Sequence, residues 1–318
     1  MTNWKSITLE TPRLILRPWR EEDAEALYRF ASDPLVGPPA GWPPHTSVED
    51  SRGIIRGVLS ARETYALVLR YDTVDTANGA IIPCGTPVGS VGIMFKGCGS
   101  YPHMKNSEAE IGYWIGLPLW GRGLVPEAVR AIQARCFTDL GLDGLWCGYY
   151  EGNEKSRRVQ EKCGFDSRLR MEIPPHPLNG ATAEYFTYLS REDWEAGRRP
   201  TIHDMRLREA PFRAVASGKK KVELRLYDEK RQAIQAGDTI RFTLTDGGES
   251  MSATVAGVRY FPDFEALYAA LIPLVGKEGL GYAEGDIPHP ADMLAYYSPN
   301  AIAHYGVCGI EIQLNSEI

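Results

Sequence analysis

Long hydrophobic runs are missing from this 318-residue sequence, because its apolar stretches are short and are broken by charges, Gly or Pro. A membrane-spanning helix needs about 20 predominantly apolar residues, so we expect none here and no membrane partner. The N-terminal stretch also lacks a basic start followed by an uninterrupted apolar segment. We therefore expect no signal peptide and a cytoplasmic location.

Cysteine motifs are missing as well. The sequence has no C-x-x-C pair and no His/Cys cluster with the spacing of a zinc site. We expect neither a disulfide framework nor a bound metal, and interpret the thiols as buried or unreactive. The six cysteines are Cys84, Cys98, Cys136, Cys147, Cys163 and Cys308.

An excess of positive charge is absent from the chain as a whole, whose formal net charge is −6. This disfavours broad electrostatic binding to nucleic acid. One segment departs from the average: residues 205–231 hold nine Lys or Arg and four acids, a local net charge of +5. A local basic surface can therefore exist in an acidic protein.

The length and the pattern of elements predict two domains, residues 1–198 and 199–318, at roughly 100–200 residues per domain. The polar stretch Arg198-Arg199-Pro200 is the predicted linker. In the first domain the pattern predicts the order β-α-α-β-β-β-α-β-α-β-β, a layered α/β (α+β) domain with a mixed sheet. The second fits a small β-barrel with flanking helices.

A glycine-rich turn follows the predicted strand at 108–115. It reads Trp120-Gly121-Arg122-Gly123 and opens a helix predicted at 126–138. Such a turn exposes backbone N–H groups at the positive end of a helix, which suits a pyrophosphate. The two glycines let the backbone approach the phosphates closely. By itself, an ordinary strand–helix turn explains this pattern equally well.

A second motif about thirty residues later changes that balance. Asn153 and Ser156 open a predicted helix that ends in Cys163-Gly164-Phe165, and the chain begins with Thr11-Pro-Arg-Leu. Together these motifs resemble the GNAT acetyltransferases, particularly the branch that acetylates ribosomal-protein N-termini. The resemblance covers about residues 7–190, with departures at Pro118 and Pro126. It implies a GNAT mixed sheet, acetyl-CoA as the co-substrate and a primary amine as the acceptor.

The resemblance also implies catalytic roles. Glu110 matches the strand carboxylate that deprotonates the amine, although a solvent-facing strand Glu is the alternative. Ser156 matches a residue proposed to protonate the departing thiolate, and a helix-surface Ser is the alternative. Many GNAT enzymes carry a Tyr where this chain has Cys163. Tyr149 is therefore a further candidate acid, as is Tyr150, unless both only pack against their neighbours.

The implied acetyl-CoA contacts combine backbone and side chains. The N–H groups near Ile115 would polarise the thioester carbonyl, Asn153 would bind the pantetheine arm or cap its helix, and arginines would neutralise phosphates unless they are simply solvated. The predicted cofactor-binding residues are Ile115, Trp120, Gly121, Arg122, Gly123, Leu124, Val125, Asn153 and Arg158.

The second domain carries the pattern G-x-K-x-x-E-x-R, formed by Gly218, Lys220, Glu223 and Arg225. Over about residues 202–314 it resembles the ASCH domain, a PUA-like small β-barrel associated with RNA. This resemblance implies RNA-binding residues Lys219, Lys220, Glu223 and Arg225. The alternative is a solvated basic hairpin in which Glu223 is paired internally. The ASCH subgroup that hydrolyses acetylcytidine carries Thr where this chain has Glu223, so we do not expect that activity.

Three functions remain open from the sequence. The first is acetyl transfer to a primary amine on an RNA-linked acceptor, such as aminoacyl-tRNA or an aminoacyl-nucleotide. The second is protein N-terminal acetylation with the ASCH domain docking on the ribosome. The third is a non-catalytic RNA-binding protein that senses CoA, against which the retention of the candidate catalytic residues argues.

Overall fold

An eight-stranded sheet forms the framework of the first of two compact units, Met1–Arg198 and Arg199–Ile318. The computed structural model describes residues 7–75, 78–197, 200–283 and 285–314. Neighbouring strands of this sheet are antiparallel except β7 and β8. The spatial order is β1 (Leu9–Glu10), β2 (Leu14–Pro18), β3 (Thr64–Leu69), β6 (Pro87–Phe95), β7 (Glu108–Ile115), β8 (Gly144–Tyr150), β10 (Ala183–Ser190) and β9 (Asp166–Glu172).

The two parallel strands pair over only part of their length. β7 and β8 are in register at three positions, the last of which joins Glu110 to Trp146. Beyond Glu110, β7 continues to Ile115 in register with β6 on its other side. The backbone of β7 from Ile111 onward thus continues past its pairing with β8.

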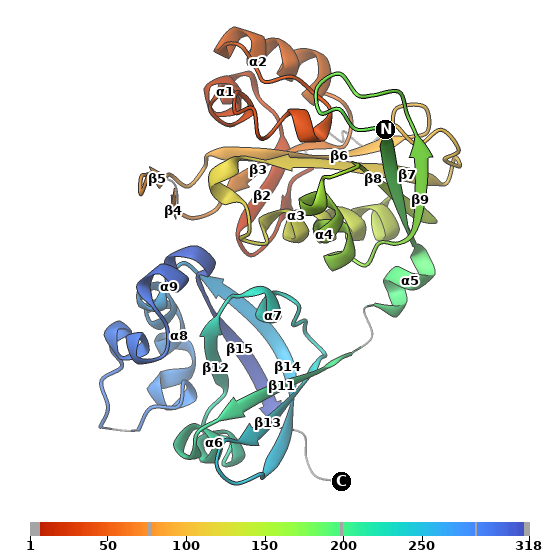
Figure 1. The fold of residues 1–318 in the computed structure, drawn as a ribbon. Helices are drawn as coiled ribbons and strands as arrows, with labels where there is room; N and C mark the ends of the chain where they lie inside the picture. Colours follow the sequence, from red (N-terminus) through yellow and green to blue (C-terminus); the bar gives the residue numbers. More distant parts are fainter. Residues whose placement is uncertain (1–6, 76–77, 198–199, 284, 315–318) are drawn as a thin grey trace. The chain divides into compact units, whose positions relative to one another are not determined.

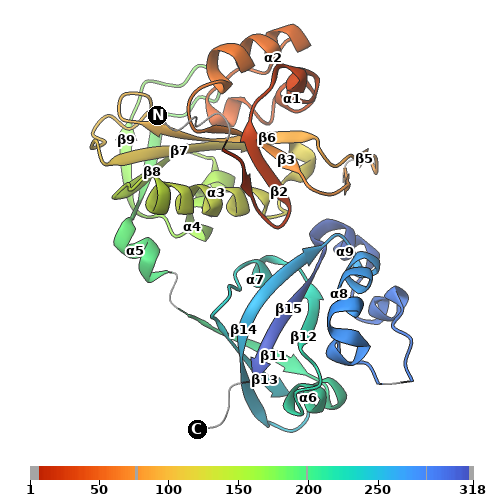
Figure 2. The same cartoon turned by 180° about the vertical axis from the view of Figure 1, so that it is seen from behind.

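Helices cover both faces of the sheet (Figures 1 and 2). α1 (Ala24–Ala31) and α2 (Val48–Ile54) lie on one face, and α3 (Leu124–Ala134) and α4 (Glu154–Lys162) lie on the other. Because successive strand residues point to opposite faces, Tyr65 and Leu67 of β3 pack in the core beneath α3, whereas Ala66 packs with α1. Burial on both faces explains why this strand reads as a continuous apolar run.

Several elements differ from the sequence-based expectations. The alternating pattern at 7–19 predicts one strand, but the structure divides it into β1 and β2, because the Thr11 side chain hydrogen-bonds to the backbone of Leu14. The pattern at 48–62 predicts one helix, which is α-helical only to Ile54 and continues as a π-helix, Ile55–Leu59. The polar segment 72–86, which predicts no strand, holds a short hairpin of β4 (Thr73–Val74) and β5 (Ile81–Ile82), and the sequence pattern does not predict α5 (Arg191–Ala196).

The second unit is a curled five-stranded sheet, a half-barrel with helices beside it (Figure 1). All neighbours are antiparallel except β11 and β13. Its edge strands are linked by a side chain, since Arg225 Nη2 donates to the Arg206 carbonyl over 3.1 Å. The strand order is β11 (Ile202–Leu207), β13 (Thr239–Leu244), β14 (Ser250–Phe261), β15 (Val307–Leu314) and β12 (Val222–Leu226); the helices are α6 (Glu209–Ala216), α7 (Glu229–Gln232), α8 (Phe264–Gly279) and α9 (Pro299–Tyr305).

The sequence pattern predicts a helix at 263–274 followed by a loop at 276–290, but α8 extends to Gly279. Gly276 has a φ of +68°, so the helical course is interrupted there and resumes for one more turn before Gly279. The six cysteines are free thiols. Within the described ranges, no His, Cys, Asp and Glu side chains are grouped as metal ligands, and no helix has the length and hydropathy to cross a bilayer.

Candidate active site

Strand β7 presents its side chains alternately to the two helical layers. Ala109, Ile111 and Ile115 are part of the core under α3, whereas Trp114 packs in the cluster that includes α1. Glu110 shares the Trp114 face and Tyr113 the opposite one, since strand side chains alternate. Where the β7–β8 pairing ends, the Glu110 carboxylate thus lies on one face of β7 and the Tyr113 hydroxyl on the other.

Glu110 is a buried carboxylate with both oxygens engaged. Its side chain is 4% exposed. Ser100 Oγ donates to Oε1 over 2.7 Å, and the Tyr101 N–H donates to Oε2 over 2.9 Å. A Cβ on Gly99 would lie 2.4 Å from Oε2, so only glycine allows this loop to close over the carboxylate. The solvent-facing alternative considered for Glu110 does not describe this environment.

A second carboxylate, Glu184 of β10, lies beside the first. Its Oε1 is 3.2 Å from Ser100 Oγ, the same hydroxyl that contacts Glu110. Burial raises the pKa of the Glu184 carboxyl above its ordinary value; the charge of Glu110 adds to this, and the Ser100 hydroxyl opposes it. The Glu110 and Glu184 carboxylates therefore flank one hydroxyl, that of Ser100.

On the opposite face, Ser156 belongs to a cluster of hydroxyls. Its Oγ is 3.0 Å from the Tyr113 hydroxyl and accepts from Gln160 Nε2 over 3.2 Å. Thr187 donates to Gln160 Oε1 over 2.7 Å, which fixes the orientation of that amide. Burial raises the pKa of Tyr113 well above its ordinary value, so its phenol stays protonated. The side chains of Tyr113, Ser156, Gln160 and Thr187 thus form a connected polar cluster on the α3–α4 side of β7.

The glycine-rich turn has the backbone conformation that its sequence requires. Gly121 and Gly123 have φ values of +76° and +73°, and Gly123 is the N-cap of α3, followed by Leu124 and Val125. The Trp120 indole N–H donates to the Ile115 carbonyl over 2.9 Å. Lys155 lies 3.8 Å from the centroid of the Trp120 ring. The end of β7, the turn and the start of α4 are thus joined.

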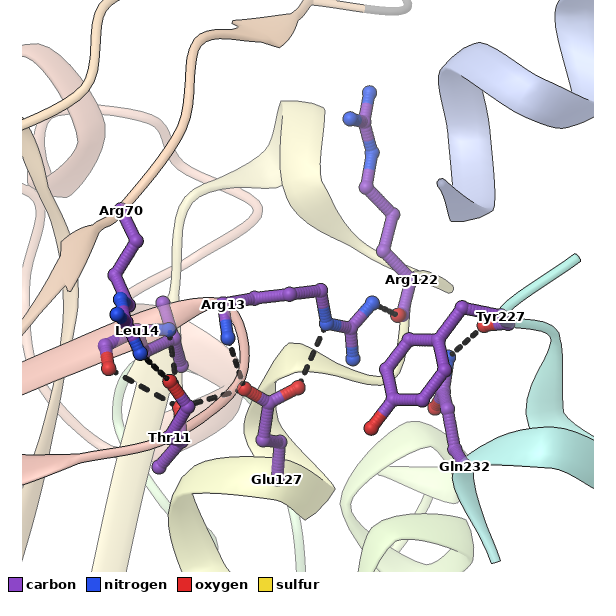
Figure 3. A network of polar contacts seen from close by, with 8 residues as sticks. All are labelled: Thr11, Arg13, Leu14, Arg70, Arg122, Glu127, Tyr227 and Gln232. Atoms are coloured by element: carbon purple, nitrogen blue, oxygen red, sulfur yellow. Dashed lines mark hydrogen bonds and ion pairs between the residues drawn. The ribbon is translucent and has the colours of Figure 1, made fainter. Parts of the chain in front are cut away.

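A buried ion pair holds this turn in place (Figure 3). Glu127 in the first turn of α3 accepts from Thr11 Oγ1 over 2.6 Å and from the Arg13 backbone N–H over 2.8 Å. Arg13 Nε lies 2.7 Å from Glu127 Oε2, and Arg13 Nη1 donates to the Arg122 carbonyl over 2.7 Å. The Thr-Pro-Arg opening therefore anchors the start of α3 to β2.

The other predicted residues have more varied surroundings. The Arg122 side chain is 3% exposed and donates to the Val74 carbonyl, so it is directed to β4. Asn153 caps α4 by accepting from the Ser156 N–H, and its amide donates to the Pro39 carbonyl. Arg158 is exposed on α4. Tyr149 is buried and stacks on Tyr185, with ring centroids 5.3 Å apart.

Ser100, Glu184 and Tyr113 were not singled out by the sequence patterns. Of the three, only Tyr113 had a usable signal, because it lies three residues past Glu110 in the same strand and must face the opposite layer. Ser100 lies in an irregular loop, and Glu184 is 84 positions further along the chain. Neither position follows from a local pattern.

In the second unit, the predicted motif forms an internal charge network. Glu223 is buried, with Lys220 Nζ 2.8 Å from one carboxylate oxygen and Arg225 Nε 2.7 Å from the other. Burial would raise the pKa of Glu223, but the two cations outweigh it and hold that pKa below its ordinary value. This geometry matches the internal pairing considered as an alternative for Glu223. Lys219 next to it is exposed.

Comparisons with known proteins agree with this division. The model of the GNAT acetyltransferase domain matches residues 13–166, and the model of the ASCH domain matches residues 205–312. The uncharacterized N-acetyltransferase p20 of Bacillus licheniformis is 31% identical over 159 residues, which are 50% of this chain and 82% of that protein.

Two further relatives cover different shares. The protein of Bacillus subtilis provisionally named ribosomal N-acetyltransferase YdaF is 42% identical over 92 residues, 28% of this chain and 49% of that protein. A solved GNAT-family acetyltransferase from Bacillus anthracis is 21% identical, with a TM-score of 0.46 over 58% of this chain and 99% of that one. From the matched domain and the p20 relative, the chain belongs to the GNAT family as an acetyl-CoA-dependent N-acetyltransferase with an added ASCH domain.

Proposed function

We propose that the acceptor of this N-acetyltransferase is an α-amino group carried on RNA, as in an aminoacyl-tRNA or an aminoacyl-nucleotide. An amine must be neutral to attack a thioester. An α-amine with a pKa of about 7.7–8.0 is neutral far more often at pH 7 than a lysine with a pKa of about 10.4. The carboxylates of Glu110 and Glu184 suit this acceptor, because an α-ammonium group gives up its proton more readily than the ammonium group of a lysine.

The observation that carries the proposal is the position of Glu110. It is the last residue of β7 that pairs with β8, it is buried, and it lies on the face opposite Tyr113 and Ser156. An amine on the Glu110 side and a leaving thiol on the Tyr113 side would thus meet where the two strands stop pairing. In this arrangement Glu110 accepts the proton of the amine, and the hydroxyl cluster supplies one to the sulfur.

The RNA part of the proposal rests on the ASCH match and on the exposed cations of residues 205–231. Within this segment Lys220 and Arg225 are paired with Glu223, and Arg213 is paired with Glu209 and Glu249. The side chains that remain exposed for phosphate contacts are Arg206, Arg208, Lys219, Lys221 and Lys230.

Acetylation of alanyl-tRNA and of a free peptide with an N-terminal alanine tests the acceptor directly. We expect faster transfer to alanyl-tRNA, with a KM that rises steeply with salt because phosphate contacts release counterions. Replacing Lys219 and Lys221 together by Ala should raise that KM and flatten its salt dependence, while Lys277→Ala in α8 serves as the matched control. Acetylation of alaninamide should be unchanged in both variants.

The alternative acceptor is a protein N-terminus, which the name of the B. subtilis relative favours. In that case the peptide would be acetylated at least as well as alanyl-tRNA, and deacylated tRNA would not compete. That result would contradict the RNA-linked acceptor and leave the ASCH domain as a docking module.

A further inference from the structure

Three side chains from three separate segments meet on the acceptor face of the first unit. Ser100 comes from the loop before β7, Glu110 from β7 and Glu184 from β10. The Ser100 hydroxyl is 2.7 Å from Glu110 and 3.2 Å from Glu184. Glu110 is buried, whereas Glu184 is partly exposed and Ser100 is exposed. The cluster therefore connects a buried base with the surface.

The Ser100 hydroxyl has one proton and two neighbouring carboxylates. A serine hydroxyl has one proton to donate and can accept through its lone pairs. The Ser100 hydroxyl can therefore donate to Glu110 over 2.7 Å or to Glu184 over 3.2 Å, but not to both at once. Burial raises the pKa of the Glu184 carboxyl, and the charge of Glu110 adds to this. The two carboxyls are thus coupled through one hydroxyl.

Each carboxylate lies against a glycine, which gives it room. A Cβ on Gly99 would lie 2.4 Å from Glu110 Oε2, and a Cβ on Gly148 would lie 2.9 Å from Glu184 Oε1. Gly148 is in β8, beside the register pair of Glu184 with Tyr150. A side chain larger than hydrogen at either position would displace the neighbouring carboxylate. The two glycines therefore allow both carboxylates to lie close to Ser100.

The groups around the pair are acidic and aromatic. On β8, Tyr150 has its pKa raised by burial first and then by the charges of Glu184 and Glu110. On β9, the register partner of Glu184 is the uncharged Met171. His176 packs on Tyr150 with ring centroids 4.7 Å apart, and His103 packs on Tyr101 at 5.9 Å.

We propose that Glu184 is a second proton-accepting carboxylate of the active site, coupled to Glu110 through Ser100, so that the pair takes up the proton of the acceptor. This rests on the proposed role of Glu110 as the base. In the step, the amine nitrogen forms a bond to the acetyl carbonyl carbon and the carbon–sulfur bond breaks. The nitrogen proton passes to the pair, and the thiolate takes a proton on the Tyr113 side.

The pH dependence of kcat/KM for acetyl transfer to alaninamide tests the coupling. Glu184→Gln removes the carboxyl whose pKa is raised, so the acid limb should move to lower pH. The kcat should fall about 10-fold to 100-fold, because one of the two proton acceptors is gone. Ser100→Ala should resemble Glu184→Gln, and Ser100→Thr, which keeps the hydroxyl, should resemble the wild type.

Glu172→Gln is the matched control, because Glu172 is an exposed carboxylate on the neighbouring strand that pairs with Arg170. It should leave the profile unchanged. A purely structural role for Glu184 would lower the rate at every pH without moving the acid limb, and that result would overturn the proposal. So would a normal rate and profile in both Glu184→Gln and Ser100→Ala.

A measurement without turnover separates this inference from the acceptor proposal. Carbon-13 titration of glutamate carboxyls in the full chain should show Glu184 titrating at lower pH in Glu110→Gln than in the wild type, because the charge of Glu110 adds to the raised pKa of Glu184. An unchanged Glu184 titration would refute the coupling even if alaninamide is a good acceptor. If the wild type does not acetylate alaninamide, the α-amine proposal fails, and the titration still decides whether the two acids are coupled.

Discussion

In the proposed mechanism, Tyr113 and Ser156 lie on the opposite face of β7 from the base Glu110. Tyr113 is three residues from Glu110, so it faces the other layer and meets Ser156 at the start of α4. Its hydroxyl also contacts the Ser156 carbonyl over 3.2 Å. Because burial raises its pKa, the phenol keeps its proton at neutral pH and can donate a hydrogen bond to an anion such as a thiolate.

We therefore predict that Tyr113→Phe and Ser156→Ala each lower kcat, by up to about 10²–10⁴-fold if either is the main proton donor. The double variant should lose less than the product of the two, because the hydroxyls act as a unit. Acetyl-CoA affinity, measured by calorimetry, should change little. Tyr28→Phe in α1 is the control, and full kcat in both single variants would rule the cluster out as the proton source.

The residues of the site were predictable only where a motif is local. Glu110, Ser156 and the glycines of the turn follow from patterns within a few positions. Ser100 and Glu184 meet Glu110 through pairing of β7, β8 and β10, and that register is a property of the whole sheet. Arg13 and Glu127 are 114 positions apart, so their pairing was equally hidden in the sequence.

At the scale of elements, the start of α3 is the most constrained part of the first unit. Its turn has two residues with positive φ, and its first helical turn is tied to β2 by Glu127 and Arg13. The positive φ values and the Glu127–Arg13 ion pair fix the directions of the backbone N–H groups at the start of α3 in the absence of a ligand. A preorganised set of donors binds an anion without the free-energy cost of ordering a loop.

Gly121→Val should therefore lose affinity for acetyl-CoA by more than tenfold, because a β-branched residue does not tolerate a φ near +76°. Gly141→Val is the matched control: Gly141 also has a positive φ, +68°, and a Cβ there would meet no atom within 4 Å. Both variants should lose similar stability, about 1–3 kcal/mol. Equal acetyl-CoA affinity in the two, measured by calorimetry, would refute the pyrophosphate assignment.

Long, periodic elements were the predictable ones. The sequence pattern predicts a strand at 108–115 and a helix at 154–162, and these agree with β7 and α4 at both ends. The short helices α5, α7 and α9 were not expected, because six, four and seven residues carry too little periodic signal. They are stabilised instead by side-chain caps from Ser190, Asp228 and Ser298.

At the scale of the whole molecule, the two units can be observed separately. All seven tryptophans lie within residues 1–198, so tryptophan fluorescence reports on the first unit alone. In the second unit, Glu223 is buried and ionised between Lys220 and Arg225, so removing either cation should destabilise the unit. Hydrogen exchange of peptides from residues 200–314 measures the stability of this unit directly.

We predict that Lys220→Ala lowers the free energy of unfolding of the second unit by about 3–5 kcal/mol, because Glu223 keeps only one cation. Since the folded pKa of Glu223 is lowered, its contribution is complete above the ordinary value of 4.5 and is lost as the pH falls through the folded pKa. Exchange from 200–314 should thus accelerate on acidification below about pH 4.5, and less so in Glu223→Gln.

Arg241→Ala is the control for this effect, because it breaks an exposed ion pair with Asp204 and should cost at most about 1 kcal/mol. Tryptophan fluorescence should be unchanged in all three variants. If Lys220→Ala were as stable as Arg241→Ala, the Glu223 network would not be a structural element, and its lysine would be available for a ligand.

The alternation of β7 has a consequence for the order of events in catalysis. In the proposed arrangement the amine and the thioester lie on opposite faces of one strand, so neither substrate has to leave before the other binds. The acetyl group then passes directly between two molecules held at the same time, which gives intersecting lines in double-reciprocal plots. The nearby thiols of Cys147 and Cys163 are buried and have raised pKa values, chiefly through that burial, which makes them poor carriers for a covalent acetyl-enzyme.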